Sequence, residues 1–167
     1  MVSYYFDGKE GLYRTLLREH AQKVITQMSE AMTAGPEDLT RESFLTILDL
    51  VIDRVIEVRL GHPIMAKVIQ RENLDGFPFG EEVHREVIAP VAEKFFAFLE
   101  EAQRRKIVKP DIHPKIFFCL LYEGIWGYFL SQEHKKKSLF FDGLEFPRDK
   151  EQLKKNIFSI YVNGVLL

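Results

Sequence analysis

One pair of residues in this sequence has a spacing that suits metal or acid–base chemistry. Glu81 and His84 lie three positions apart, which places a carboxylate and an imidazole on one face of a helix. A carboxylate-bridged di-metal bundle needs two such pairs and two further glutamates. Because this is the only such pair among the five histidines, we expect no metal site.

Other enzyme signatures are also missing from the sequence. It contains no glycine-rich phosphate loop, no Gly-x-Ser-x-Gly elbow, no Cys-x-x-Cys pair and no His-Glu-x-x-His motif. The single cysteine, Cys119, lies within an apolar run, so we expect it to fill the core and not to act as a nucleophile or ligand. The sequence therefore predicts no catalytic residue, no cofactor and no enzymatic activity.

Several polar residues lie among apolar neighbours, as do the residues that orient a ligand in an apolar pocket. Glu123 stands out among them, because a carboxylate surrounded by apolar residues and glycines must find a partner or shift its pKa. The alternative is a core in which every polar group is satisfied. The full set is Arg59, His62, Arg71, His84, Tyr122, Glu123 and Trp126.

Length and composition predict one soluble domain. The chain has 167 residues, of which 46% are hydrophobic and 13% aromatic, enough for a substantial core. Its formal net charge of −2 provides no global basic field, so any contact with DNA must be local. The start at Met1 shows no secretory leader, and the longest apolar run, Ile116 to Leu130, is too short to span a membrane. Together with the single cysteine, these features predict a cytoplasmic protein without a membrane partner.

Apolar residues recur at helical spacing along the chain, and capping residues, glycines and prolines separate the segments. We therefore expect an all-α fold. Pro90 interrupts one segment, where we expect a kink and not an end. The segment from Ser138 to Pro147 predicts a turn in a surface loop, with a β-hairpin as the alternative. The expected helices run from about Asp7 to Gly35, Thr40 to Gly61, Pro63 to Asn73, Glu81 to Arg105, Lys115 to Ser131 and Asp149 to Val165.

The last two expected helices carry more apolar surface than the core of one chain can cover. Gly124 and Gly127 each destabilise a helix by about 1 kcal/mol relative to alanine. A close approach by another backbone would explain why glycine stands at these positions. An internal packing contact is the alternative. We expect a twofold homodimer through these helices. The predicted interface residues are Phe117, Leu120, Gly124, Gly127, Leu153, Ile157, Ile160 and Gly164.

A bent helix does not pack flush along a straight neighbour, so Pro90 also predicts a gap. We place this gap between the first helix, the kinked helix and the helix from Lys115 to Ser131. A solid core is the alternative. The expected ligand is a small apolar or aromatic effector, oriented by one or two polar contacts. The predicted ligand-binding residues are His62, Met65, Phe95, Phe118, Tyr122, Glu123 and Trp126.

The first seventeen residues resemble a segment of TetR-family transcriptional regulators. An aromatic cluster at residues 4–6, two loop residues, Lys9-Glu10 and then Leu12 match the end of the family's DNA-reading helix and the start of the next helix. The resemblance implies that residues 1–8 are the remnant of a helix-turn-helix head. It implies that residues 9–167 form a TetR-like C-terminal regulatory domain, whose last two long helices build a four-helix bundle across the dimer.

The resemblance also implies a function, that of the effector-binding and dimerisation body of a transcriptional regulator, in the simplest case a repressor. An effector would tilt the helix that starts at Lys9 and change the spacing of two DNA-reading helices, which must lie about 34 to 36 Å apart. Tyr5 and Lys9 stand where the family commonly contacts DNA phosphate, while Ser3 stands where many members have a tyrosine.

A three-helix head needs about 45 residues, more than precede Lys9. Operator DNA is therefore an expected partner only where the missing head is present. Three explanations fit the missing head. The chain has been shortened, its start has been assigned at an internal methionine, or the protein is a natural relative without a head. The rival function is a headless, helical, dimeric binding or scaffold protein that does not contact DNA.

Overall fold

The computed structural model describes residues 8–31, 39–134 and 149–166. Within these ranges the regular structure is helical, apart from one antiparallel bridge between Val108 and Leu166. The all-α prediction is confirmed. No helix in the described ranges is both long and apolar enough to cross a membrane. The elements are α2 (Gly8–Ala31), α3 (Arg41–Gly61), α4 (Pro63–Leu74), α5 (Glu81–Val83), the π-helical segment η2 (His84–Ile88), α6 (Ala89–Arg104), α7 (Pro114–His134) and α8 (Lys150–Tyr161).

Capping residues fix the starts of α3, α4 and α8. The Thr40 hydroxyl accepts the amide N–H of Ser43 at 3.1 Å, and the Ser43 hydroxyl accepts that of Thr40 at 2.8 Å, which forms a capping box. Pro63 occupies the first turn of α4, where its missing N–H costs nothing. The Asp149 carboxylate accepts amide N–H groups of the first turn of α8. These predicted starts are confirmed.

The last helix is shorter than predicted. It ends at Tyr161, because the following residues turn back toward the end of α6. The Val165 carbonyl accepts the amide N–H of Lys109 at 2.9 Å, and the Gly164 carbonyl accepts the Lys109 ammonium at 2.8 Å. These bonds tie the C-terminal segment to the chain between α6 and α7. The predicted turn at Ser138 to Pro147 lies outside the described residues.

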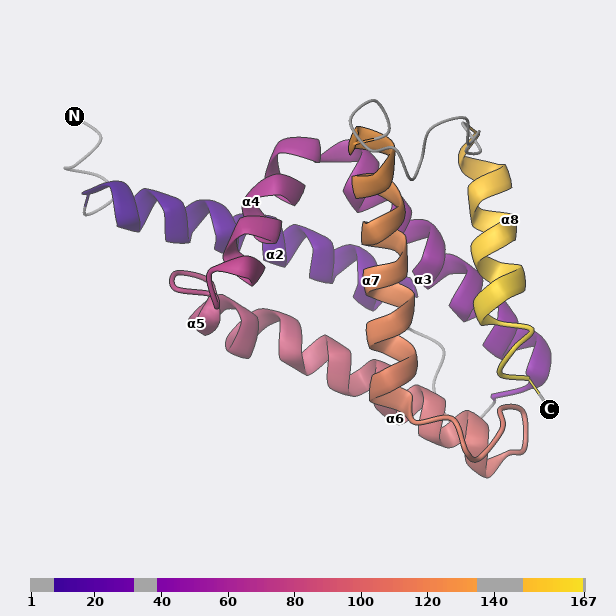
Figure 1. The fold of residues 1–167 in the computed structure, drawn as a ribbon. Helices are drawn as coiled ribbons and strands as arrows, with labels where there is room; N and C mark the ends of the chain where they lie inside the picture. The colour runs from indigo at the N-terminus through magenta and orange to yellow at the C-terminus, as the bar shows by residue number, and fades with distance from the viewer. Residues whose placement is uncertain (1–7, 32–38, 135–148, 167) are drawn as a thin grey trace.

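The helix around Pro90 continues through the proline, as predicted. A proline lacks an amide donor and crowds the carbonyl four residues earlier, here that of Glu86. A π-helical turn just before the proline accommodates the missing donor and the crowding. In this turn the Ala89 amide donates to the His84 carbonyl. The segments α5, η2 and α6 therefore follow one another as one extended helical body (Figure 1).

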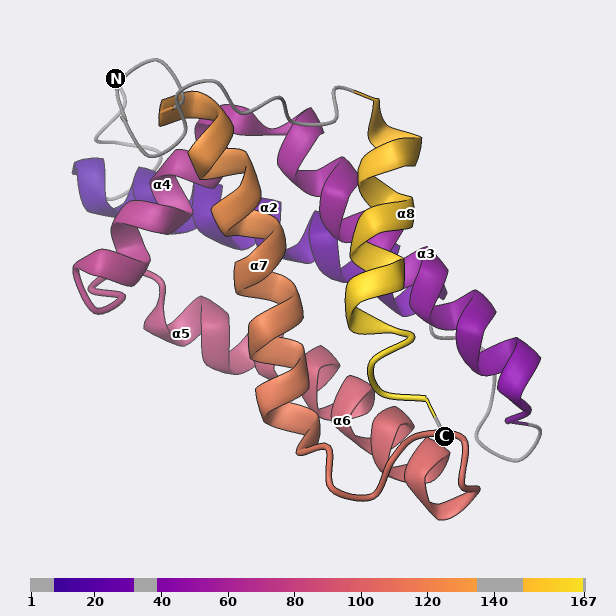
Figure 2. The ribbon, with the colours of Figure 1, turned by 45° about the vertical axis from the view of Figure 1, so that its right-hand side comes forward.

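Two apolar clusters hold the helices together. The larger is built around α3, where fully buried side chains recur every four residues at Phe44, Leu48, Ile52 and Ile56 and pack against α6, α7 and α8. Burying each such side chain stabilises the fold by about 2 kcal/mol. The smaller cluster joins α2 to α4 and α5. Figures 1 and 2 both show α7 and α8 side by side across the body.

A ladder of ion pairs fixes α8 to α3. The Lys150 ammonium lies 2.9 Å from Asp53 and 3.0 Å from Glu57, and the Lys154 ammonium lies 2.8 Å from Asp49 and 3.4 Å from Asp53. Burial alone would raise the pKa of Asp53, but the two lysines outweigh it and hold this pKa below its usual value. Because acids and lysines recur every four residues, each set forms a row on its own helix.

Candidate ligand-binding cavity

A cavity of about 400 Å³ lies between the two apolar clusters. This volume is within the range of small-molecule sites, about 300 to 1,000 Å³. Every helix except α8 contributes to its lining. Most of the lining is apolar and includes Val24 and Met28 of α2, Val55 of α3, Ile69 of α4 and Val91 of α6.

The cavity has the walls that the sequence predicted, namely α2, α6 and α7. It is also bordered by α3, which the prediction did not include, and by α4, which the prediction brought to the site through His62 and Met65. Five of the seven predicted ligand-binding residues line it: Phe95, Phe118, Tyr122, Glu123 and Trp126. Their binding of a ligand stays a prediction.

His62 and Met65 do not line the cavity but lie one layer behind it. The His62 ring packs edge-on against the ring of His20, a lining residue, with 5.3 Å between ring centroids. Met65 packs against the smaller cluster, whose buried members Leu17 and Ala21 reach the cavity. These two residues therefore support the wall and do not form it.

Aromatic rings form one wall of the cavity. Phe118, Tyr122 and Trp126 recur every four residues on α7, and their neighbouring ring centroids lie 6.0 and 5.7 Å apart. Phe95 of α6 packs against Phe118 with a centroid distance of 5.4 Å. The guanidinium of Arg59 lies 5.5 Å from the ring centroid of Trp126, a cation–π contact that fixes the end of this wall.

The Tyr122 hydroxyl is a polar group within this wall. Burial strongly raises the pKa of Tyr122, and the nearby negative charge of Glu123 raises it further, while a hydrogen bond with Trp126 acts in the opposite direction. The hydroxyl is therefore neutral at physiological pH. It can donate a hydrogen bond to a bound molecule or accept one from it.

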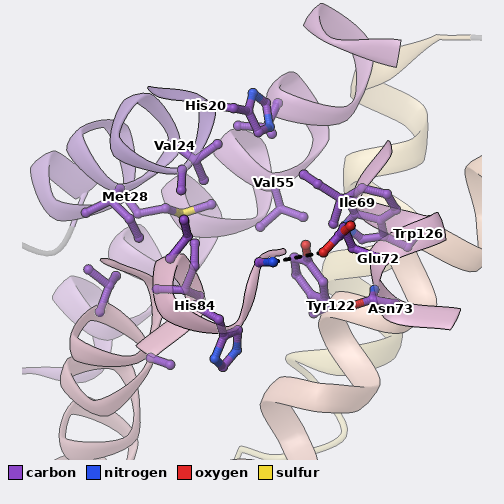
Figure 3. A pocket seen from close by; sticks show the side chains of 18 of the residues that line it. His20, Val24, Met28, Val55, Ile69, Glu72, Asn73, His84, Tyr122 and Trp126 are labelled. Atoms are coloured by element: carbon purple, nitrogen blue, oxygen red, sulfur yellow. Dashed lines mark hydrogen bonds between the residues drawn. The ribbon is translucent and has the colours of Figure 1, made fainter. Parts of the chain in front are cut away.

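Glu72 is a lining residue that the sequence analysis missed. Only 3% of it is exposed, and its carboxylate accepts the amide N–H groups of Phe79 at 3.1 Å and Gly80 at 2.9 Å. Figure 3 shows this side chain at the same end of the cavity as Tyr122 and Trp126, with Val24 and Met28 toward the other end. The signal was present in the spacing, because Glu72 continues the face of α4 that carries Ile69.

His20 is a second lining residue that was missed. Burial lowers the pKa of its imidazole, and the nearby charges of His62 and Lys23 lower it further, so His20 is neutral at physiological pH. It lies three residues after Leu17 and four before Val24, on the apolar stripe of α2. That position was the sequence signal for a cavity residue.

Two expectations about polar residues on α7 are corrected. Glu123 was expected, as a carboxylate among apolar neighbours, either to find a partner or to shift its pKa, but it is exposed and borders the cavity, so water can solvate its carboxylate. Cys119 was expected in the core but is exposed and also borders the cavity. Arg71, another candidate, is exposed and pairs with Asp75 at 3.5 Å.

The predicted dimer residues fall into two groups. Phe117, Leu153 and Ile157 are buried in the core of the chain itself, so they offer almost no surface to a partner chain. The other five are exposed: Leu120 and Ile160, at 59% and 69%, and Gly124, Gly127 and Gly164.

Of the two residues predicted to contact phosphate, the structure describes only the one at the start of α2. Lys9 is exposed in its first turn, and Tyr5 lies outside the described residues. No family model matches this sequence, and no curated protein matches it either. A function must therefore be inferred from the structure itself, namely from the cavity, from α2 and from the exposed residues of α7.

Proposed function

We propose that this chain is the effector-binding and dimerisation body of a TetR-like transcriptional regulator, in the simplest case a repressor. Its affinity for DNA would be switched by a small, mostly apolar molecule. The observation that carries this proposal is that one face of α2 borders the cavity over three turns, through Leu17, His20, Ala21, Val24, Ile25 and Met28. The residues ahead of this helix are those that resemble the DNA-reading element.

A ligand in the cavity would contact α2 directly. The N-terminal half of α2 is held to α5 and η2 by ion pairs of Arg14 and Arg18 with Glu82 and Glu86, at 2.9 to 3.9 Å. All four side chains are substantially exposed, and such pairs contribute at most about 1 kcal/mol each. These ion pairs therefore oppose a tilt of α2 only weakly, and the apolar contacts of Leu17 and Ala21 would have to shift with the helix. In a dimer this tilt would shift the population between two spacings of the DNA-binding heads.

Dimerisation is supported by the exposed apolar surface on α7 and α8. Ile116 and Leu120 of α7 are each 59% exposed, and Ile160 of α8 is 69% exposed. A Cβ atom added at Gly127 would meet nothing within 4 Å, so this part of α7 is open to a close approach by a second backbone. A TetR-like dimer would pair these helices with their copies in a four-helix bundle and bury at least about 1,200 Å².

The alternative function is a headless dimeric binding or scaffold protein, which the same cavity and surface permit. The genomic sequence upstream of residue 1 separates the two. An in-frame extension that encodes two helices joined by a turn supports the regulator, and the extended protein should then shift operator DNA in a gel in an effector-dependent way. A stop codon close upstream favours the alternative.

The cavity itself can be tested with a panel of hydrophobic ligands. Trp126 is the only tryptophan, so its fluorescence reports on the aromatic wall. Ligands that raise the melting temperature should change this emission, and Tyr122→Ala should weaken their binding. If the emission stays unchanged and Tyr122→Ala binds equally well, the ligand site is not this cavity.

A further inference from the structure

Two lining residues carry a formal charge at pH 7, and both are acidic, while the lining histidines His20 and His84 are formally neutral. Glu72 enters from α4 and Glu123 from α7, and neither lysine nor arginine is among the lining residues in the described part of the chain. A wholly apolar site would have no preference for either sign of charge. The two carboxylates, one on α4 and one on α7, give this cavity a negative potential. This potential is strongest where water is excluded.

The buried carboxylate is held by neutral groups. The amide N–H groups of Phe79 and Gly80 donate to Glu72, and Tyr13 is hydrogen-bonded to it as well. These bonds fix the position of the carboxylate and stabilise it without cancelling its net charge. Glu72 therefore presents a fixed negative charge at the end of the cavity where Figure 3 shows Tyr122 and Trp126.

The aromatic wall favours the same sign of ligand charge. The faces of Phe, Tyr and Trp rings carry negative potential and attract cations by about 0.5 to 2 kcal/mol. One cation already lies at the end of this wall, because the guanidinium of Arg59 is 5.5 Å from the ring centroid of Trp126, so the ring of Tyr122 is the one left to a cationic ligand. Arg59 itself does not line the cavity, since its guanidinium lies over the rings of Trp126 and Phe129.

We propose that the cavity selects lipophilic cations, meaning molecules with an aromatic or aliphatic body and one delocalised or quaternary positive charge. The body would contact the apolar lining from α2, α3 and α6, and the charge would lie toward Glu72, Glu123 and the ring of Tyr122, away from the guanidinium of Arg59. Apolar carboxylates of similar size would be disfavoured by the two acids. This inference rests on the proposed function, because it names the chemical class of the effector.

Tetraphenylphosphonium and tetraphenylborate provide a direct test, because they share one shape and have opposite charges. Binding to the full chain is measured by isothermal titration calorimetry and by Trp126 fluorescence. We expect the phosphonium ion to bind at least about tenfold more tightly at low salt, which corresponds to about 1.4 kcal/mol. The preference should decrease as ionic strength rises, because Glu123 is exposed to screening.

Single substitutions assign the preference to the two carboxylates. Glu123→Gln should weaken phosphonium binding about threefold to tenfold and should leave the melting temperature unchanged, because Glu123 is exposed. Glu72→Gln should weaken it at least as much, and its melting temperature reports any loss of folding. Glu100→Gln is the matched control, because it removes the same charge from an exposed position on α6 outside the cavity.

Each outcome decides something different. Equal binding of the two ions, a preference for the borate, or a phosphonium preference that survives both glutamate substitutions would overturn the proposed charge selection and leave the cavity as a ligand site. If neither ion nor any neutral hydrophobic ligand changes the Trp126 emission or the heat of mixing, the proposed function fails as well.

Discussion

Gly124 of α7 and Tyr161 of α8 pack so closely that a Cβ atom at Gly124 would lie 2.1 Å from the Tyr161 hydroxyl oxygen. One of the two glycines that the sequence marked for close approach is thus used within the chain. The other, Gly127, has open space where a side chain would be. Substitutions at the two positions therefore test different contacts: Gly124 tests packing within the chain, and Gly127 tests association between two chains.

Gly124→Ala should destabilise the folded chain. The added methyl group forces the Tyr161 ring to move, and overpacking of this kind outweighs the better helix propensity of alanine by about 1 kcal/mol. Urea unfolding of a monomeric or fully dimeric sample measures this difference. Stability equal to or greater than that of the parent would contradict a close and rigid contact between Gly124 and the Tyr161 ring.

Gly127→Leu should break the dimer and leave the subunit folded. Leucine is a better helix former than glycine by almost 1 kcal/mol, and the new side chain would occupy the space that the partner helix needs. Analytical ultracentrifugation at micromolar concentration should show the parent as a dimer and the variant as a monomer. A parent that sediments as a monomer would refute dimerisation through this surface.

The ion-pair ladder predicts a specific loss of stability in Lys154→Met. The substitution keeps the aliphatic stem but leaves Asp49 and Asp53 with one lysine fewer, which should cost about 1 kcal/mol at low salt. Lys155→Met is the control, because Lys155 is exposed on the same helix. Equal unfolding free energies for the two variants would mean that the ladder adds nothing to stability.

The ladder also predicts an acid-dependent loss of stability. The pKa of Asp53 in the folded chain lies below its ordinary value near 3.8, so the unfolded chain binds protons more readily. The stabilisation from Asp53 is therefore complete above about pH 4 and is lost as pH falls through the lowered pKa. In Lys154→Met this acid-induced loss should be smaller than in the parent.

His20 predicts a second pH dependence, closer to neutrality. The pKa of His20 is lowered in the folded chain, so the unfolded chain binds a proton first as pH falls below about 6.5. Stability should therefore decrease between pH 7.5 and pH 5. His20→Asn should reduce this decrease, measured by urea unfolding at both pH values. An identical pH dependence in parent and variant would contradict the half-buried position of His20.

A cavity-filling substitution tests the site without removing a polar group. Ala92→Phe projects a ring from α6 into the cavity, so it should reduce the affinity for hydrophobic ligands at least about tenfold. The fold should survive, because the ring enters space that no side chain occupies. Ala97→Phe, at an exposed position on the same helix, should bind ligands like the parent. Unchanged ligand affinity in Ala92→Phe would place the binding site elsewhere.

Much of the fold could be predicted from local signals. Thr40, Pro63 and Asp149 start helices because their side chains or fixed backbone angles satisfy the first turn, which is a short-range effect. The end of α8 could not be predicted in this way. It depends on hydrogen bonds from Lys109, more than fifty residues away in the sequence.

The candidate site was predictable only in part, for a related reason. Periodicity identified the aromatic column of Phe118, Tyr122 and Trp126, because one helix presents all three rings. Glu72 resembles an ordinary surface glutamate at a helix end, and it is buried only because the loop to Gly80 folds over it. Spacing places Glu72 and His20 on the apolar faces of α4 and α2, but tertiary packing decides which polar residue on such a face borders a cavity.

The central claim is that a ligand in the cavity moves α2 within a dimer, and the distance between the two α2 helices tests it most directly. Lys9→Cys places a spin label on the exposed first turn of α2, in a Cys119→Ser background that removes the one native thiol. Double electron–electron resonance then measures the label-to-label distance across the dimer. We predict that a saturating hydrophobic ligand shifts the distance distribution away from that of the free protein. A distribution that is identical with and without bound ligand, or a sample without any intermolecular dipolar coupling, would contradict the claim.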